Sequence, residues 1–301
     1  MELERVTLDQ VSVYQELYGL PALRNPLVSV FDLKEATLPG FQHHMVHFEC
    51  FLILLKQSLH YGDYGREPYD FSDGTVIIFS PGVDLPVDFE REILKPDAVG
   101  VVWHPDLMYG TPLGDLIHHL GFLSYSQMEA LHLSEEERDI VRDCLAHINT
   151  EIERPIDGHS NDLISANICV LLQHINRFYD RQFITRHKAN SEVVNRFNRE
   201  LVDIVETGRL RDGIPPVSYF AEKANLSPGY FGDLIKKETG ASVKEIISRR
   251  VVTYAKQRLA KTRDDISTIA YDLGFQYPQH FTRLFKRITG VSPTVYRAQT
   301  R

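Results

Sequence analysis

Near its C-terminus the sequence repeats itself at a distance of 50 residues. The segment SPGYFGDLIKKETGAS, residues 227–242, aligns with YPQHFTRLFKRITGVS, residues 277–292, and seven of the 15 positions in 228–242 are identical. The identical residues include the Pro that opens each segment and the Gly that closes it, which are residues that start and stop helices. Such a repeat predicts two copies of one supersecondary unit.

A short helical pattern precedes each copy. VSYFAEKA comes before the first and DISTIAYDLGF before the second. A short helix, a tight turn and a second helix with a polar face form the helix-turn-helix arrangement. In the second copy, the face opposite Phe281 carries Gln279, His280, Arg283 and Arg287. A helix of this kind fits the major groove of DNA, where early residues reach base edges and later cations neutralise phosphates.

The segment between the copies sets their separation. Residues 242–261 have the composition of one continuous helix and begin with a capping box, Ser242 and Glu245. Twenty residues at ~1.5 Å each span about 30 Å. Neighbouring major-groove faces lie ~34 Å apart along one side of a duplex. One chain can therefore place both second helices in adjacent grooves, which favours DNA over a generic polyanion.

The charge distribution supports a polyanionic partner. The whole chain has a net charge of −8, but residues 195–301 carry 19 Lys and Arg against 11 Asp and Glu, a net of +8, so residues 1–194 carry −16. One amphipathic helix with charges facing water would explain a single copy. Two copies in a basic region favour DNA binding.

The same residues resemble a known family. The segment NLSPGYFGDLIKKETG, followed by ISTIAYDLGFQYPQHFTRLFKRITGVSPTVYR, is similar to the DNA-binding domain of the AraC/XylS transcription regulators. The resemblance covers about 100 residues and implies a seven-helix module with two helix-turn-helix units. It also implies DNA-contacting residues in both units. These are Ser227, Gly229, Tyr230, Asp233, Lys236 and Lys237 in the first, and Gln276, Gln279, His280, Arg283, Lys286 and Arg287 in the second. Gly229 offers no side chain and Asp233 is acidic, so we expect the second unit to read more of the base sequence.

The N-terminal half has a different pattern. Five β-branched or aromatic-rich runs between residues 27 and 104 are separated by turn-forming residues, which is typical of an antiparallel sandwich or barrel. Two helices with heptad-like apolar spacing follow at 134–154 and 161–180, the first opened by a capping box, Ser134 and Glu137. This hairpin either packs on the sheet or contributes to a homodimer. The resemblance implies a cupin-like effector domain in this place.

We therefore expect an α+β multidomain chain. Its N-terminal β-sandwich or cupin-like barrel occupies residues 1–132, the helical dimerisation segment and linker 133–190, and the all-α double helix-turn-helix domain 191–301. Three distant cysteines without a CxxC motif argue against a disulfide framework and a structural zinc site, and no signal peptide or apolar span is evident. These features predict a cytoplasmic protein. The repeat predicts that it binds double-stranded DNA, and the helical hairpin at 134–154 and 161–180 is a candidate for forming a homodimer.

The effector site is harder to predict. We name six candidates: His44, His47, Arg66, Trp103, His104 and Tyr109. Polar pocket lining, surface histidines and a core Trp103 remain alternatives. The run HHMVHFE, residues 43–49, differs from the His-x-His of cupin metal sites, and no nucleophile–base arrangement stands out, so we expect no metal, no cofactor and no enzymatic activity. A cupin-type metalloenzyme with an accessory DNA-binding domain is the alternative, and a β-domain that binds no ligand is a third possibility.

Overall fold

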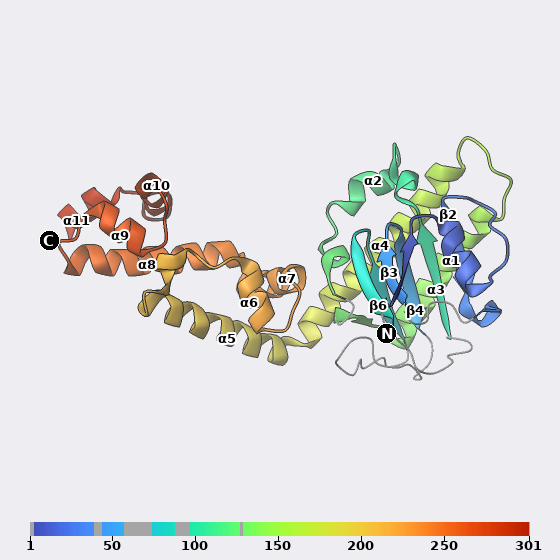
Figure 1. Cartoon of the computed structure of the whole chain (residues 1–301), viewed down its shortest axis with the longest axis horizontal. Helices are drawn as coiled ribbons and strands as arrows, with labels where there is room; N and C mark the ends of the chain where they lie inside the picture. Colours follow the sequence, from blue (N-terminus) through green and yellow to red (C-terminus); the bar gives the residue numbers. More distant parts are fainter. Residues whose placement is uncertain (1–2, 39–43, 57–73, 88–96, 127–128, 301) are drawn as a thin grey trace. The chain divides into compact units, whose positions relative to one another are not determined.

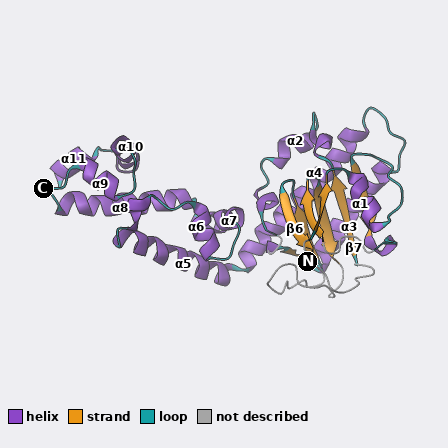
Figure 2. Cartoon of the chain, viewed as in Figure 1, coloured by secondary structure: helices purple, strands orange, loops and turns teal. Residues whose placement is uncertain are grey.

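The computed structural model describes residues 3–38, 44–56, 74–87, 97–126 and 129–300. The chain divides into two compact units, Met1–Ile184 and Thr185–Arg301. Strands occur in the first unit, and the described part of the second is helical (Figure 2). The sequence therefore predicted the sheet-rich N-terminal and helical C-terminal parts correctly. No helix in the described part of the chain is long and apolar enough to cross a membrane.

The first unit contains two sheets. The larger has the strand order β2-β7-β4-β5-β8, and the smaller has the order β1-β3-β6. The strands are β1 Glu4–Leu8, β2 Val28–Asp32, β3 His44–Phe48, β4 Phe51–Lys56, β5 Thr75–Phe79, β6 Val83–Val87, β7 Ala98–Trp103 and β8 Leu131–His132. Pairing is antiparallel except for β1 and β3, which are parallel. The sequence pattern did not predict β1 or this parallel pair.

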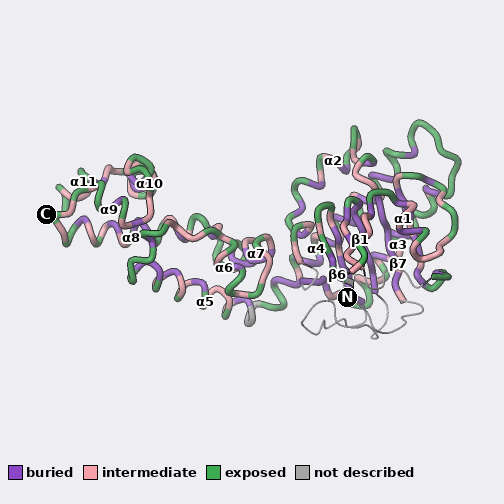
Figure 3. Tube along the Cα trace, in the orientation of Figure 1, coloured by how far each residue is buried: buried purple, intermediate pink, exposed green. Residues whose placement is uncertain are grey.

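The larger sheet has a hydrophobic core on each face. Along β4, Ile53 and Leu55 pack on one side with helices α3 and α4, whereas Leu52 and Leu54 pack on the other with the small sheet and α1. Successive side chains of a strand point to opposite faces, so a strand buried on both faces reads as a continuous apolar run. This explains the unbroken FLILL segment. In Figure 3 most of the strands are buried.

Four α-helices and several 3-10 turns complete the described part of the first unit. The helices are α1 Val11–Tyr18, α2 Pro112–Ile117, α3 Glu135–Ile152 and α4 Ser160–Thr185, and one of the 3-10 turns, η1 Leu33–Glu35, follows β2. Ser134 and Glu137 form the predicted capping box at the start of α3. The apolar stripes of α3 and α4, from Val141 to Tyr179, lie in the core on the larger sheet. Packing on the sheet, one of the two expected roles of this hairpin, is therefore observed.

The second unit is built along one central helix. Its helices are α5 His187–Glu206, α6 Val217–Lys223, α7 Pro228–Thr239, α8 Val243–Lys261, α9 Ile266–Asp272, α10 Pro278–Thr289 and α11 Pro293–Gln299. The continuous α8 confirms the helix expected between the two repeats, with its Ser242–Glu245 capping box. The pair α6–α7 lies toward one end of α8 and the pair α9–α10 toward the other (Figure 1).

Candidate nucleic-acid interface

The repeated residues build the same local structure twice. Thr239 at the end of α7 donates to the Ile235 carbonyl at 2.6 Å and accepts from the amide of Ala241. Thr289 does the same with Phe285, at 2.8 Å, and with Val291. The glycines that follow, at positions 240 and 290, have φ values of 73° and 83° and end their helices in the left-handed conformation.

The turns between the paired helices are also alike. The amides of Leu226 and Phe275 each bond to a carbonyl five residues earlier, at 2.9 and 3.1 Å. This is the longer bond of a Schellman motif, in which one residue adopts a positive φ. That residue is Asn225 at 55° in the first turn and Gly274 at 82° in the second. A Cβ on Gly274 would lie 2.2 Å from the Leu210 carbonyl oxygen, so this turn requires glycine.

Helix α10 presents a polar and cationic face. Phe281 and Phe285 are fully buried, which fixes the rotation of the helix against the domain core. All six predicted contact residues of this unit are exposed. They are Gln276, Gln279, His280, Arg283, Lys286 and Arg287. His280 contacts the Tyr277 ring edge-on, with centroids 5.5 Å apart. The structure thus gathers this half of the predicted set on one surface.

Helix α7 presents a weaker version of that face. Lys236 and Lys237 are exposed, whereas Gly229 and Asp233 are half-buried. The Ser227 hydroxyl accepts a hydrogen bond from the Tyr230 amide at 3.2 Å, the expected N-cap. Tyr230 itself is 4% exposed, so its ring belongs mostly to the domain core. The first unit therefore offers fewer side chains to a groove than the second.

The cationic side chains of α10 differ from several others of the second unit in whether they pair with a carboxylate. Several of those hold the fold together: Lys223 pairs with Glu200 at 2.9 Å, and Arg258 lies 2.6 Å from Asp264 and 3.2 Å from Asp272. In the described part of the chain, Arg283, Lys286 and Arg287 have no such carboxylate partner. A cluster of unneutralised cations on one helix face suits a row of phosphates.

The predicted effector residues lie in separate surroundings. Trp103 is fully buried and stacks on Phe51 with centroids 5.0 Å apart. The His104 ring accepts from the amide of Asp106 at 3.1 Å, and Tyr109 is 79% exposed.

The histidines of β3 lie beside carboxylates of the two neighbouring strands, β1 and β6. His47 lies 2.8 Å from Asp84 through Nδ1, and His44 lies 3.8 Å from Glu4. Arg66 and His43 lie outside the described residues. Among the described residues no group of three or more His, Cys, Asp or Glu gathers to hold a metal.

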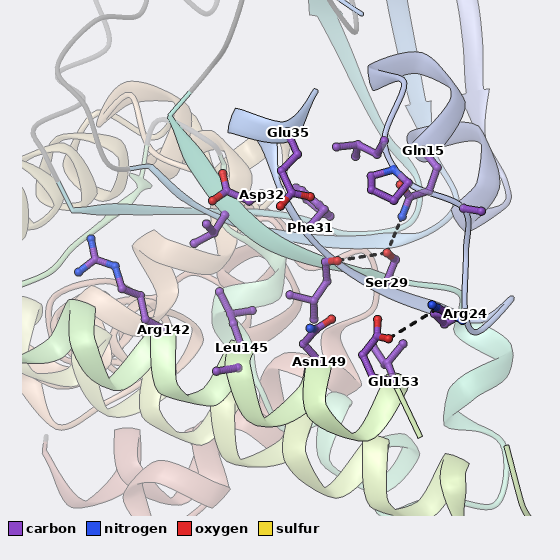
Figure 4. A pocket seen from close by; sticks show the side chains of 17 residues that line it. Gln15, Arg24, Ser29, Phe31, Asp32, Glu35, Arg142, Leu145, Asn149 and Glu153 are labelled. Carbon is purple, nitrogen blue, oxygen red and sulfur yellow. Dashed lines mark hydrogen bonds and ion pairs between the residues drawn. The ribbon is translucent and has the colours of Figure 1, made fainter. Parts of the chain in front are cut away.

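Two features escaped the sequence pattern. One is the Arg258 ion-pair network, whose acidic members lie six and 14 residues away and give no local signal. The other is a cleft of the first unit, lined by residues of α1, β2, η1 and α3 (Figure 4). Its lining residues come from segments more than 100 positions apart, and no spacing rule connects them.

Comparison with known proteins agrees with this geometry. A family model described as a helix-turn-helix domain matches residues 220–299. The TetD protein of transposon Tn10 from Escherichia coli is 40% identical over 77 residues, which cover 26% of this chain and 56% of that protein. The arabinose operon regulatory protein of Escherichia coli strain K12 is 33% identical over 89 residues, covering 30% of each chain. The chain spans less than half the length of the first curated relatives it matches.

Two solved structures are also similar to parts of the chain. The DNA-binding domain of AdpA, solved in complex with a target DNA, is 25% identical and covers 37% of this chain and 92% of its own, with a TM-score of 0.31. ToxT from Vibrio cholerae is 13% identical and covers 90% of this chain and 93% of its own, with a TM-score of 0.30.

Proposed function

We propose that this protein is a sequence-specific DNA-binding transcription regulator whose C-terminal domain is a helix-turn-helix domain of the AraC/XylS type. The match of a helix-turn-helix family model and the similarity to the arabinose operon regulatory protein support this proposal. The observation that carries the proposal is the exposed face of α10, where Arg283, Lys286 and Arg287 lie without carboxylate partners in the described structure. A helix face with this chemistry, repeated in weaker form on α7, matches the requirements of the major groove.

The geometry of the second unit supports a two-groove mode of binding. Helix α8 has 19 residues, which at ~1.5 Å each give about 28 Å between the two helix-turn-helix units. This is close to the ~34 Å that separates adjacent major-groove faces. In this mode Gln279, His280 and Arg283 read base edges, while Lys286, Arg287, Lys236 and Lys237 neutralise phosphates. Helix α7 contributes less base reading because Gly229 and Asp233 occupy the corresponding early positions.

The first unit is proposed as a cupin-like sensor domain. Its two sheets and the α3–α4 hairpin are compatible with a domain that binds a small effector and forms a homodimer through 134–154 and 161–180. Effector control requires a ligand that prefers one arrangement of the dimer over another. As a regulator of transcription, the protein would act in the cytoplasm. No enzymatic activity is part of the proposal.

A cupin-type metalloenzyme with an accessory DNA-binding domain is the rival proposal. Neither the histidine surroundings of β3 nor the curated relatives favour it. Metal analysis of the purified full chain distinguishes the two proposals, because the enzyme requires stoichiometric iron, manganese or zinc.

A salt titration of DNA binding tests the proposed function. Binding of the full chain to duplex DNA should weaken linearly in log K against log salt, with a slope of about −0.9 for each phosphate contacted. The double variant Lys286→Ala with Arg287→Ala should make that slope less steep by the contribution of roughly two phosphate contacts. Arg154→Ala, a change of an exposed arginine in the first unit that lies outside the residues proposed to contact DNA, serves as the control. A flat titration of the unaltered chain would contradict the proposal.

A further inference from the structure

The first unit contains a cleft of about 530 Å³ that none of the predicted effector residues lines. Helix α3 forms one wall with Arg142, Leu145 and Asn149, together with its C-cap residue Glu153. Strand β2, η1 and α1 form the other (Figure 4). Apolar groups, among them Val30 and Leu145, alternate with polar ones along the lining. A concave site with apolar walls and a few polar groups is the usual form of a small-molecule site.

One polar group in the wall lacks a partner. Gln15 is 8% exposed, and its Nε2 donates to the hydroxyl of Ser29 at 2.5 Å. Its Oε1 is buried and accepts no hydrogen bond in the described structure. Leaving a buried acceptor unsatisfied is unfavourable. Gln15 lines the cleft, so a ligand that carries an N–H or O–H donor can supply the missing bond once the side chain turns its oxygen toward the cleft.

The charged residues of the cleft indicate which kind of hydrogen-bond donor a ligand would carry. Both arginines in the lining are engaged by carboxylates: Arg24 lies 3.6 Å from Glu153, and Arg142 lies 3.1 Å from Asp139. Asp32 and Glu35 also line the cleft, and the described residues provide neither with a cationic side chain. The backbone amide of Lys34 bonds to Asp32 at 2.9 Å. Two carboxylates without a counter-charge favour a cation.

We propose that this cleft binds a small organic cation, an aliphatic amine whose ammonium group lies at Asp32 and Glu35. The aliphatic part lies against Val30 and Leu145, and a second donor bonds to Gln15. The excess of 16 negative charges in residues 1–194 adds a field that attracts such a ligand.

The position of the cleft suggests how its occupancy acts. A ligand held between β2 and α3 contacts the helix that the proposed function assigns to the dimer. It would therefore stabilise one placement of α3 on the sheet over others. This identification of the effector rests on the proposed function, whereas the binding of an amine by the cleft does not.

Calorimetric titration of the full chain tests the inference. The probe is 1,4-diaminobutane, and 1,4-butanediol and succinate serve as neutral and anionic compounds of the same chain length. We expect the diamine to bind at least tenfold more tightly than the diol, with no binding of succinate. Equal or tighter binding of the diol or succinate would overturn the assignment. So would the absence of heat with diamine up to about 10 mM, a concentration that reveals millimolar affinity.

Variants locate the binding site. Asp32→Asn with Glu35→Gln should weaken diamine binding at least tenfold, and Gln15→Met should weaken it as well. Glu16→Gln, which removes an exposed carboxylate of α1 outside the lining, should not. Thermal unfolding verifies that each variant is folded.

DNA binding of the same variants, measured without diamine, should be unchanged. Diamine binding that Asp32→Asn with Glu35→Gln leaves intact would overturn the site. A chain that binds diamine but no duplex DNA would instead contradict the proposed function.

Discussion

Arg283 lies on the exposed face of α10, one turn from Gln279 and with no carboxylate partner in the described structure. An arginine at this place in a recognition helix can form a bidentate contact with guanine, worth about 1–3 kcal/mol of discrimination. We expect Arg283→Ala to relax the base preference at one position of the bound site by that amount. Competition binding with single-base variants of a selected duplex measures it.

The control is Arg154→Ala, a change of an exposed arginine in the first unit that pairs with Glu151. It should leave the base preference unchanged at every position. If Arg283→Ala weakens binding equally on all sequences, Arg283 contacts a phosphate and the base-reading role is wrong.

Lys56 is a buried cation at the end of β4. It is 5% exposed, and burial lowers the pKa of its ammonium group from 10.5 to about 7. Between these two values the unfolded chain binds more protons than the folded one, so the stability of the first unit rises as pH increases through this window. Lys56→Met should remove this dependence and stabilise the unit at pH 7, on the order of 1–3 kcal/mol.

Denaturant unfolding of the full chain between roughly pH 6.5 and pH 9 measures this pH dependence of stability. The range covers most of the titration of a group with a pKa of about 7. Lys34→Met, at an exposed lysine paired with Asp97, should retain the slope of the unaltered protein. An unchanged slope in Lys56→Met would show that another group causes the pH dependence.

At the scale of elements, Arg258 ties α8 to the loop before α9 and to α9 itself. Its guanidinium donates to Asp264 at 2.6 Å and to Asp272 at 3.2 Å, and these hydrogen bonds raise its pKa. Hydrogen bonds to charged groups each contribute about 1.5–3 kcal/mol. Arg258→Met should therefore destabilise the second unit by roughly 1–3 kcal/mol in thermal unfolding.

The exposed Arg250 of the same helix provides the matched control. Arg250→Met should change the unfolding temperature little, because an exposed arginine contributes little to stability. Equal unfolding temperatures for the two variants would mean that the Arg258 network does not hold α9 in place.

The elements of the second unit could be predicted because their signals are local. A serine followed by a glutamate three positions later started α8, and the repeated Thr-Gly pair ended α7 and α10. The first unit was less predictable. The parallel pairing of β1 with β3 joins residues 40 positions apart, and nothing in the β1 segment indicates its partner.

The candidate sites show the same division. The face of α10 follows from helical periodicity, so Gln279, His280 and Arg283 could be identified from their spacing. The cleft could not, because it depends on the packing of α3 against β2, which brings Asn149 and Gln15 to one cavity. Trp103 was a candidate effector residue with a place in the core as the alternative, and it is fully buried in the core.

At the scale of the whole molecule, the central claim is that α7 and α10 of one chain enter adjacent major grooves. A chemical-protection footprint of the full chain on a duplex selected from a random pool tests it most directly. We expect two protected major-groove segments on one face of the duplex, centred about 10 base pairs apart, with stronger base-specific protection at the segment that α10 contacts. A single protected segment for each bound chain, or protection of the minor groove, would contradict the account.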